Sequence, residues 1–225
     1  QKNEKVRKKC GELPAKEAES SAPWERVNVD LTGPPSVKAS NGTFALNALT
    51  MIDPATGWFE AKETNERTAD IVAQAFDDCW LTRYPRPTYL GCDNGKENKG
   101  LFDVLITNYK LKRKPTTAYN PQSNGIVERV HAVLNDMLRT FELEERELCE
   151  PDPWSEFLSA AAFAIRATYH TTLEATPAQL VFGRDMILPV SVKANWQRIK
   201  ERRQEEINRN DARENQGRIA HEHKV

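Results

Sequence analysis

The segment WERVNVDLTGP, which begins at Trp24, constrains the fold more than any other part of the chain. Apolar and polar residues alternate along it until a Gly-Pro pair ends the pattern, which predicts a β-strand with one buried side. Asp30 falls on the polar side, facing away from the valines. The first predicted element is therefore a strand that carries a carboxylate within it.

The segments that follow predict a mixed sheet flanked by helices. Turns at 41–42 and 53–57 separate two further strands, so the first three strands should form an antiparallel meander. Thr68 is the predicted N-cap of a helix, because apolar residues at helical spacing follow it, and the helix should end before Pro85. The predicted strands are 24–34, 43–53, 57–63, 87–93 and 111–117; the predicted helices are 68–84, 100–109, 153–172 and one that opens at Pro121 or shortly after it. This order predicts an α/β domain whose five-stranded mixed sheet is flanked by helices.

The overall composition limits the classes of function. With 225 residues, of which 39% are hydrophobic and 29% charged, the chain is long enough to bury a sizeable core. Its formal net charge of -1 gives no general support for nucleic-acid binding, so such a role has to rest on local charge. The four cysteines lack metal-ligand spacing and indicate reduced thiols inside a cell. No apolar run approaches the roughly 20 residues that span a bilayer, so we expect no membrane partner.

Both ends of the chain are more polar than its middle. Residues 1–23 are basic and rich in small residues, which favours a linker, with a DNA-contacting arm as the alternative. Residues 195–225 are highly charged and nearly free of apolar side chains, which is typical of a solvated helix or linker. Because the chain starts at Gln1 and not at Met, we expect a processed product or a fragment.

A polar loop and the helix after it form the first functional candidate. Residues 114–139 read KPTTAYNPQSNGIVERVHAVLNDMLR, with turn-forming Asn-Pro, Ser-Asn and Asn-Gly pairs before the helix. Glu128 lies near the start of that helix. Functional residues are often carried by loops on a rigid scaffold, so the pattern indicates a site in which this acid has partners.

Two more acids lie where packing alone explains a carboxylate poorly. Asp30 is inside the first strand, and Asp93 ends the fourth strand before an Asn-Gly turn. If these strands are neighbours, both aspartates point into one site, to which the following helix can bring Glu128. Clustered carboxylates repel one another unless a cation neutralises them, and their oxygens suit Mg²⁺ or Mn²⁺. Two such ions would stabilise the entering and leaving oxygens of an in-line phosphoryl displacement.

Taken singly, each acid also has a plain structural explanation. Asp30 fits an exposed strand position, Asp93 a turn former and Glu128 a surface position on a helix. Taken together with the loop, they favour a metal site.

Three motifs, in the same order along the chain, resemble a known family. They are PWERVNVDLTGP around Asp30, DNGKEN at Asp93 and TAYNPQSNGIVERVHAVLNDMLR around Glu128, and ATPAQLVFGR near 175–184 is a fourth signature. In them the chain resembles the catalytic core of retroviral-type integrases, most closely those of LTR retrotransposons of the Ty3/gypsy type. The resemblance covers nearly all of residues 23–190.

The resemblance implies an RNase H-like fold and a DDE triad of Asp30, Asp93 and Glu128 that holds two Mg²⁺ or Mn²⁺ ions when DNA is bound. It implies two reactions: trimming of the element's 3′ ends by water, and attack of the freed 3′-OH on target DNA. It also implies dimers that assemble into larger complexes on DNA, with other products of the same Pol polyprotein as partners. The protein would first be part of a cytoplasmic particle and would then act in the nucleus of the host cell.

The same resemblance divides the chain into three parts. Residues 1–23 would be a basic linker after a missing zinc-binding domain, and 24–190 the catalytic core. Residues 191–225 would be a charged helical linker towards a missing carboxy-terminal module.

Two departures from the family pattern concern the loop and the helix. The 34 residues between Asp93 and Glu128 are one fewer than usual in the family, and the turns after Glu128 offer His131, Ala132 and Asn135 where lysine or arginine is common. We therefore expect other basic residues to grip DNA. The expected DNA-contacting residues are Tyr119, Asn120, Gln122, Ser123, Asn124, Arg129, His131, Lys112 and Lys114.

Some of these residues have structural alternatives. The basic run at 110–114 suits phosphate contact, or an edge strand that uses lysine to block pairing. His131 would orient Glu128 or contact DNA, or else be a surface histidine. Four tryptophans are expected in the core and not as platforms for stacked bases: Trp24, Trp58, Trp80 and Trp154.

Two other functions remain open at this point. One is a domesticated integrase-like domain that binds DNA or assembles without catalysis. The other is an RNase H-type nuclease of the same fold, a family that lacks the NPQSNG loop.

Overall fold

The computed structural model describes residues 22–33, 36–39, 42–45, 47–92, 99–113, 130, 132–137, 154–216 and 218. The chain divides into two compact units. The first, called here the sheet unit, comprises Ser21–His170 and Ala175–Ala194; the second, called here the helical unit, comprises Gln1–Ser20, Thr171–Glu174 and Asn195–Val225. Each is described by itself.

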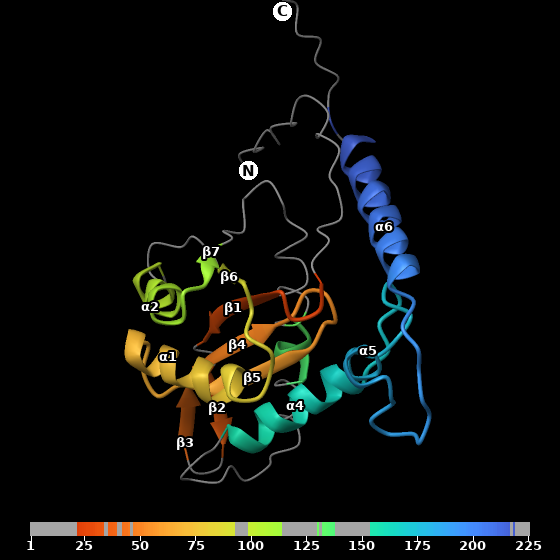
Figure 1. Ribbon diagram of the computed structural model, residues 1–225. Coiled ribbons are helices and arrows are strands. Elements are labelled where there is room, and N and C mark those ends of the chain that lie inside the picture. The colour runs from red at the N-terminus through yellow and green to blue at the C-terminus, as the bar shows by residue number, and fades with distance from the viewer. Residues whose placement is uncertain are drawn as a thin grey trace, which may run out of the picture. The chain divides into compact units, whose positions relative to one another are not determined.

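A five-stranded mixed sheet forms the centre of the sheet unit, as the sequence predicts (Figure 1). Its strands lie in the order β5-β4-β1-β6-β7, so β1 is central. β1 pairs antiparallel with β4, and β4 with β5, while β6 runs parallel to both β1 and β7. The strands are β1 (Arg26–Thr32), β4 (Ala48–Ile52), β5 (Phe59–Glu63), β6 (Tyr89–Cys92) and β7 (Lys112–Arg113).

The second predicted strand, 43–53, is wrong as a single element. The structure contains β3 (Gly42–Ala45) and β4 in its place, and β3 pairs with β2 (Ser36–Ala39) in a separate two-stranded sheet. The strand is interrupted because its two halves pair with different partners, β2 on one side and β1 with β5 on the other. The predicted meander is nevertheless present as β1-β4-β5, with the β2-β3 hairpin inserted in it.

The first predicted helix, 68–84, contains two kinds of helical turn. It begins as α1 (Ala69–Phe76) and continues as a π-helical segment, η1 (Asp77–Leu81). Thr68 is the N-cap residue, as predicted, but its side chain makes no capping hydrogen bond. The predicted helix at 100–109 is confirmed as α2 (Lys99–Tyr109).

Apolar residues on the two faces of the sheet form two separate clusters. The face that carries Val29 and Met51 packs against α1 and α2, and we call this the α1/α2 cluster. The opposite face carries Ala48, Ile52 and Phe59 and packs against α4 (Ser155–Ala167), and we call this the α4 cluster. α1 lies beside α2, and α4 runs along β5 (Figure 1).

The tryptophans belong to these clusters, as predicted. Trp58 and Trp80 are buried in the α1/α2 cluster, with Trp24 partly buried against them, and Trp154 is buried in the α4 cluster. Trp24 stacks on Tyr84, with ring centroids 5.2 Å apart. The indole rings of these four tryptophans are therefore part of the core.

The ATPAQLVFGR segment forms a short capped helix, α5 (Pro177–Phe182). Thr176 is its N-cap and forms a capping box with Gln179, which satisfies two backbone N–H groups at the helix start. Gly183 ends the helix with φ 64, in the left-handed region that glycine adopts without a steric penalty.

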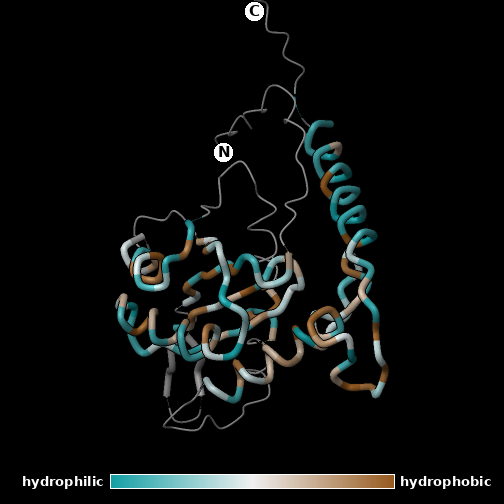
Figure 2. The backbone as a smooth tube through the Cα atoms, viewed as in Figure 1, coloured by the Kyte–Doolittle hydropathy of each residue, from teal (hydrophilic) through white to brown (hydrophobic). Residues whose placement is uncertain are grey.

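The helical unit contains a long polar helix, α6 (Trp196–Gln216), as predicted for the charged end of the chain. Figure 2 shows it as hydrophilic along most of its length, and the two residues that it buries are Ile199 and Ile207. Glu174 forms ion pairs with Arg198 and Arg202 of this helix. Within the described part of the chain, no helix is both long and apolar enough to cross a membrane.

Candidate active site

Asp30 lies on the central strand of the sheet. Its register partner on β4 is Thr50, whose hydroxyl donates to the Asp30 backbone carbonyl at 3.1 Å. Asp30 Oδ1 accepts the backbone N–H of Leu31 at 2.9 Å. The side chain is only partly buried, in a strand whose first four residues are fully buried. Asp30 therefore combines a paired backbone with a position that is only partly buried.

The first and fourth predicted strands are neighbours in the structure, which is the condition for a site shared by Asp30 and Asp93. β1 and β6 are parallel, and Val29 pairs with Cys92 at the last register position. Asp30 and Asp93 are the next residues along the two strands' sequences. Asp93 itself lies outside the described residues, so its approach to Asp30 stays a prediction.

A helical segment that follows Glu128 packs on the face of the sheet that carries Asp30. Leu134 is buried in the α4 cluster, and Val130 and Met137 pack against that cluster at helical spacing. The cluster includes Ile52, the register partner of Asn28, and directly paired residues share a face. Asn28 and Asp30 therefore face the same side as this helical segment. Glu128 lies outside the described residues, so its role stays a prediction.

The donor chemistry on this face fits a hard divalent cation. Asp30 offers carboxylate oxygen, the kind of ligand that Mg²⁺ and Mn²⁺ prefer. Among the residues that the structure describes, no three His, Cys, Asp or Glu side chains come together as a metal group. Two of the three predicted ligands, Asp93 and Glu128, are not among those residues.

Only one of the predicted DNA-contacting residues can be located. Lys112 is an exposed residue on β7, with its Nζ 6.0 Å from the centroid of the Tyr89 ring. Its neighbour Arg113 pairs with Asp103 at 3.0 Å, so part of the basic run is engaged within the protein. The other predicted contacts lie outside the described residues: Lys114, Tyr119, Asn120, Gln122, Ser123, Asn124, Arg129 and His131.

A buried polar pair next to Asp30 was not predicted. Arg26 is 2% exposed and Asn28 is 3% exposed, and Arg26 Nε donates to Asn28 Oδ1 at 2.7 Å. Asn28 pairs in register with Gly91 of β6. The sequence does contain a signal for this pair, because a glycine inside a strand, here Gly91, indicates that another group approaches the backbone closely.

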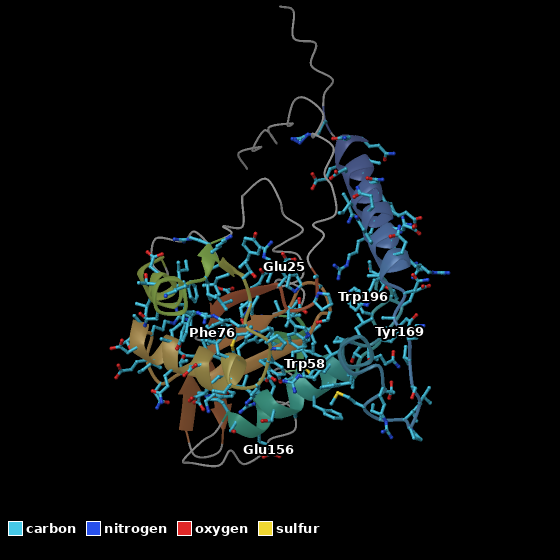
Figure 3. All side chains as sticks on the ribbon, in the orientation of Figure 1. Glu25, Trp58, Phe76, Glu156, Tyr169 and Trp196 are labelled. Atoms are coloured by element: carbon cyan, nitrogen blue, oxygen red, sulfur yellow. The ribbon has the colours of Figure 1, made fainter. Side chains whose placement is uncertain are left out.

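A second unpredicted network joins α4 to the edge strand β5. The carboxylate of Glu60 is buried, accepts a hydrogen bond from the Tyr84 hydroxyl and forms an ion pair with Arg166 of α4. The pKa of Tyr84 is raised to about 12, mainly because the phenol is buried and secondly because it donates a hydrogen bond to Glu60. Arg166 also donates to the Phe59 carbonyl at 2.7 Å. Trp58, the ring beneath this guanidinium, is labelled in Figure 3.

Comparisons of the sequence find relatives among retroelement polyproteins, although no family model matches the chain. A Retrovirus-related Pol polyprotein from transposon 412 of Drosophila melanogaster is 30% identical over 168 residues, which are 74% of this chain and 13% of the relative. The Gag-Pol polyprotein of Baboon endogenous virus is 32% identical over 140 residues, which are 60% of this chain and 8% of the relative. The chain thus spans a small fraction of the length of these relatives.

Comparisons of the structure find integrases. A chain of a simian T-cell lymphotropic virus intasome matches 85% of this chain and 64% of its own length, with a TM-score of 0.60 and 20% identity. The HTLV-2 integrase catalytic core domain, solved with magnesium in a dimeric form, matches 70% of this chain and 95% of its own length, with a TM-score of 0.51 and 18% identity. The chain is therefore a relative of retroviral and retrotransposon Pol polyproteins, and it has the fold of retroviral integrase catalytic cores. Its sheet and helices accordingly have the RNase H-like fold of those cores.

Proposed function

We propose that this integrase core joins element DNA to target DNA as a metal-dependent polynucleotidyl transferase, with Asp30, Asp93 and Glu128 as its catalytic carboxylates. The supporting observation is the register of the central strands. Val29 pairs with Cys92 in parallel, and the next residue of each segment is one of the two aspartates. The helical residues that follow Glu128 pack on the face to which Asp30 belongs.

The three carboxylates would hold the divalent ions between the DNA phosphate and the protein. When bound, the ions supply charge stabilisation for the oxygens that enter and leave the phosphorus. Asp30 is suited to this role because its backbone pairs with Thr50 of β4 and directly follows the residues of β1 that pair with β6. A carboxylate on such a rigid element meets the narrow geometric tolerance of metal coordination.

The reaction consists of two phosphoryl transfers. In end trimming, a water oxygen bonds to a phosphorus near the element's 3′ end, and the bond from that phosphorus to the 3′ oxygen breaks, leaving a 3′-OH. In strand transfer, this hydroxyl bonds to a target phosphorus, and the target strand is broken at its own 3′ oxygen. Each step replaces one phosphoester bond with another or with water's oxygen, so no external energy source is needed.

The partners of this core are part of the same proposal. We include element DNA, target DNA and other copies of the chain, with the host nucleus as the site of integration. The HTLV-2 core was solved in dimeric and trimeric forms, and the simian virus integrase in an intasome, which supports assembly. Lys112, exposed beside β6, is suited to a phosphate contact.

The test is an end-trimming and strand-transfer assay on the full-length integrase that contains this core, with the element's own terminal ends. Asp30→Asn should abolish both reactions, because the amide keeps the side-chain shape and the Leu31 contact but loses the charge. Glu156→Gln is the matched control, since Glu156 is exposed in the first turn of α4 (Figure 3). An active wild-type protein with an equally active Asp30→Asn variant would refute the assignment, and an inactive wild-type protein would favour the non-catalytic alternative.

A further inference from the structure

Gly91 has two polar side chains above it on the face of the sheet that carries Asp30. Leu90 and Cys92 belong to the α1/α2 cluster, so the alternation of β6 turns Gly91 to the opposite face. Its register partner there is Asn28. A side chain at position 91 would therefore meet the residues of β1 that lead to Asp30.

Those residues already fill the space that a side chain would need. A Cβ on Gly91 would lie 2.1 Å from Asn28 Oδ1, 2.8 Å from Arg26 Nη2 and 2.9 Å from Arg26 Nε. All three distances are shorter than real Cβ contacts. The amide and the guanidinium thus lie across β6 at the position of the missing side chain.

The pair has little room to move aside. Arg26 and Asn28 are both almost completely buried, and the 2.7 Å hydrogen bond between them fixes the amide. A methyl group at position 91 would be accommodated either by breaking that bond or by moving β6 away from β1. The first change would break a hydrogen bond between two buried polar side chains, which is costly.

Gly91 is not required for its backbone conformation. The described glycines with positive φ are Gly33, Gly57 and Gly183, and Gly91 is not among them. The absence of a side chain is therefore what matters at this position.

We propose that Gly91, Asn28 and Arg26 are positioning residues that set the spacing between β1 and β6 at the metal site. This inference rests on the proposed function, because its consequence is felt at the carboxylates. Asp30 follows Asn28 by two residues on β1, and Asp93 follows Gly91 by two residues in the sequence. Supporting residues behind metal ligands typically change metal affinity when they are altered.

The first experiment measures metal binding without catalysis. Free Mn²⁺ is titrated by electron paramagnetic resonance against the 225-residue chain and its variants. Gly91→Ala should bind Mn²⁺ about tenfold more weakly than the wild type. Gly100→Ala is the matched control, because a Cβ on Gly100, in α2, would meet nothing within 4 Å, and its affinity should equal that of the wild type.

A rescue variant separates positioning from general damage. In Gly91→Ala with Asn28→Ala, the contact that would be 2.1 Å is removed, so Mn²⁺ affinity should recover in part. Circular dichroism and a melting curve establish that each variant is folded. If Gly91→Ala does not fold, Asn28→Ala alone serves as the test, since it removes the group that Arg26 binds.

The outcomes distinguish this inference from the proposed function. Wild-type binding that is lost in Asp30→Asn but unchanged in Gly91→Ala would overturn the positioning role alone. The positioning role would also be overturned if Asn28→Ala bound Mn²⁺ with unchanged affinity, or if the double variant bound Mn²⁺ no more tightly than Gly91→Ala does. A wild-type chain that binds no Mn²⁺, or binds it as Asp30→Asn does, would overturn the metal site itself.

Discussion

Arg166 of α4 lies with its guanidinium carbon 4.5 Å from the ring centroid of Trp58. The same guanidinium pairs with the buried Glu60 and donates to the Phe59 carbonyl, so one side chain connects α4 to two residues of the edge strand β5 and to the tryptophan just before it. Arginine suits this position because its planar group stacks on an aromatic ring while its N–H groups bind a carboxylate.

Removing this connection should destabilise the protein strongly. Arg166→Ala leaves Glu60 buried without its cation, and breaking a buried ion pair in this way costs about 3–5 kcal/mol. Urea denaturation measures the change in the free energy of unfolding. Arg209→Ala is the control, because its pair with Glu206 is exposed and should contribute about 1 kcal/mol or less. Equal losses in the two variants would contradict the role of the buried pair.

The phenol of Tyr84 should make stability depend on pH in the alkaline range. Its pKa in the folded protein, about 12, is above the ordinary tyrosine value of 10.0, because burial and the hydrogen bond to Glu60 disfavour the phenolate. The contribution of the protonated Tyr84 phenol to the free energy of unfolding is therefore fully present below pH 10 and is lost as the pH rises towards 12.

Ultraviolet titration of the tyrosines tests this expectation. The transition near pH 12 should be present in the wild type and absent in Tyr84→Phe. Tyr169→Phe removes an exposed tyrosine (Figure 3) and should leave that transition in place. A transition near pH 12 that survives in Tyr84→Phe would assign it to another residue.

Divalent ions should stabilise the folded chain through Asp30. A ligand that binds only the native state adds about 2.7 kcal/mol to the free energy of unfolding at one hundred times its Kd. Melting curves with and without Mn²⁺ should therefore show a rise in Tm for the wild type and none for Asp30→Asn. Asp70→Asn, an exposed position on α1, should respond as the wild type does. An equal rise in Asp30→Asn would place the bound ion elsewhere.

The ion pairs of Glu174 in the helical unit should be weak and sensitive to salt. Glu174 pairs with Arg198 at 2.7 Å and with Arg202 at 2.9 Å, but all three side chains are partly exposed. We expect Glu174→Gln to lower the free energy of unfolding by about 1 kcal/mol or less at low salt. The difference should fade towards 1 M salt, where the screening length is about 3 Å. A loss that persists at high salt would indicate a contribution from packing instead.

The sequence alone predicts most of the sheet because its strands are locally encoded. The alternation of β1 and the turns at its ends define the meander, and the resemblance to integrases adds the RNase H-like topology. The split between β3 and β4 was not predictable, because no glycine or proline lies between them and the choice of pairing partners is what separates them. The π-helical end of α1 likewise has no clear signal in the spacing of apolar residues.

At the candidate site, the sequence identifies the acids and misses what surrounds them. Asp30 is recognisable because a carboxylate within a strand is unusual, and the pairing of β1 with β6 is the condition that a shared site requires. Arg26 was not expected in the core, because a charged residue at the start of a strand usually faces solvent. Its burial depends on Asn28 and Gly91, which come from strands far apart in the chain.

The position of β1 between two kinds of neighbour also bears on how the protein folds. On one side Val29 pairs with Met51, a residue reached through short connections, whereas on the other side it pairs with Cys92, which lies beyond β4, β5 and the whole of α1. Closing a longer loop costs more entropy and slows the formation of the contacts that depend on it. The meander can thus form from neighbouring segments, while the pairing of β1 with β6 depends on the longest crossover between paired strands of the described sheet. The proposed catalytic site depends on this pairing of β1 with β6. A chain in which the pairing is delayed would therefore already contain much of its packed core and still be inactive.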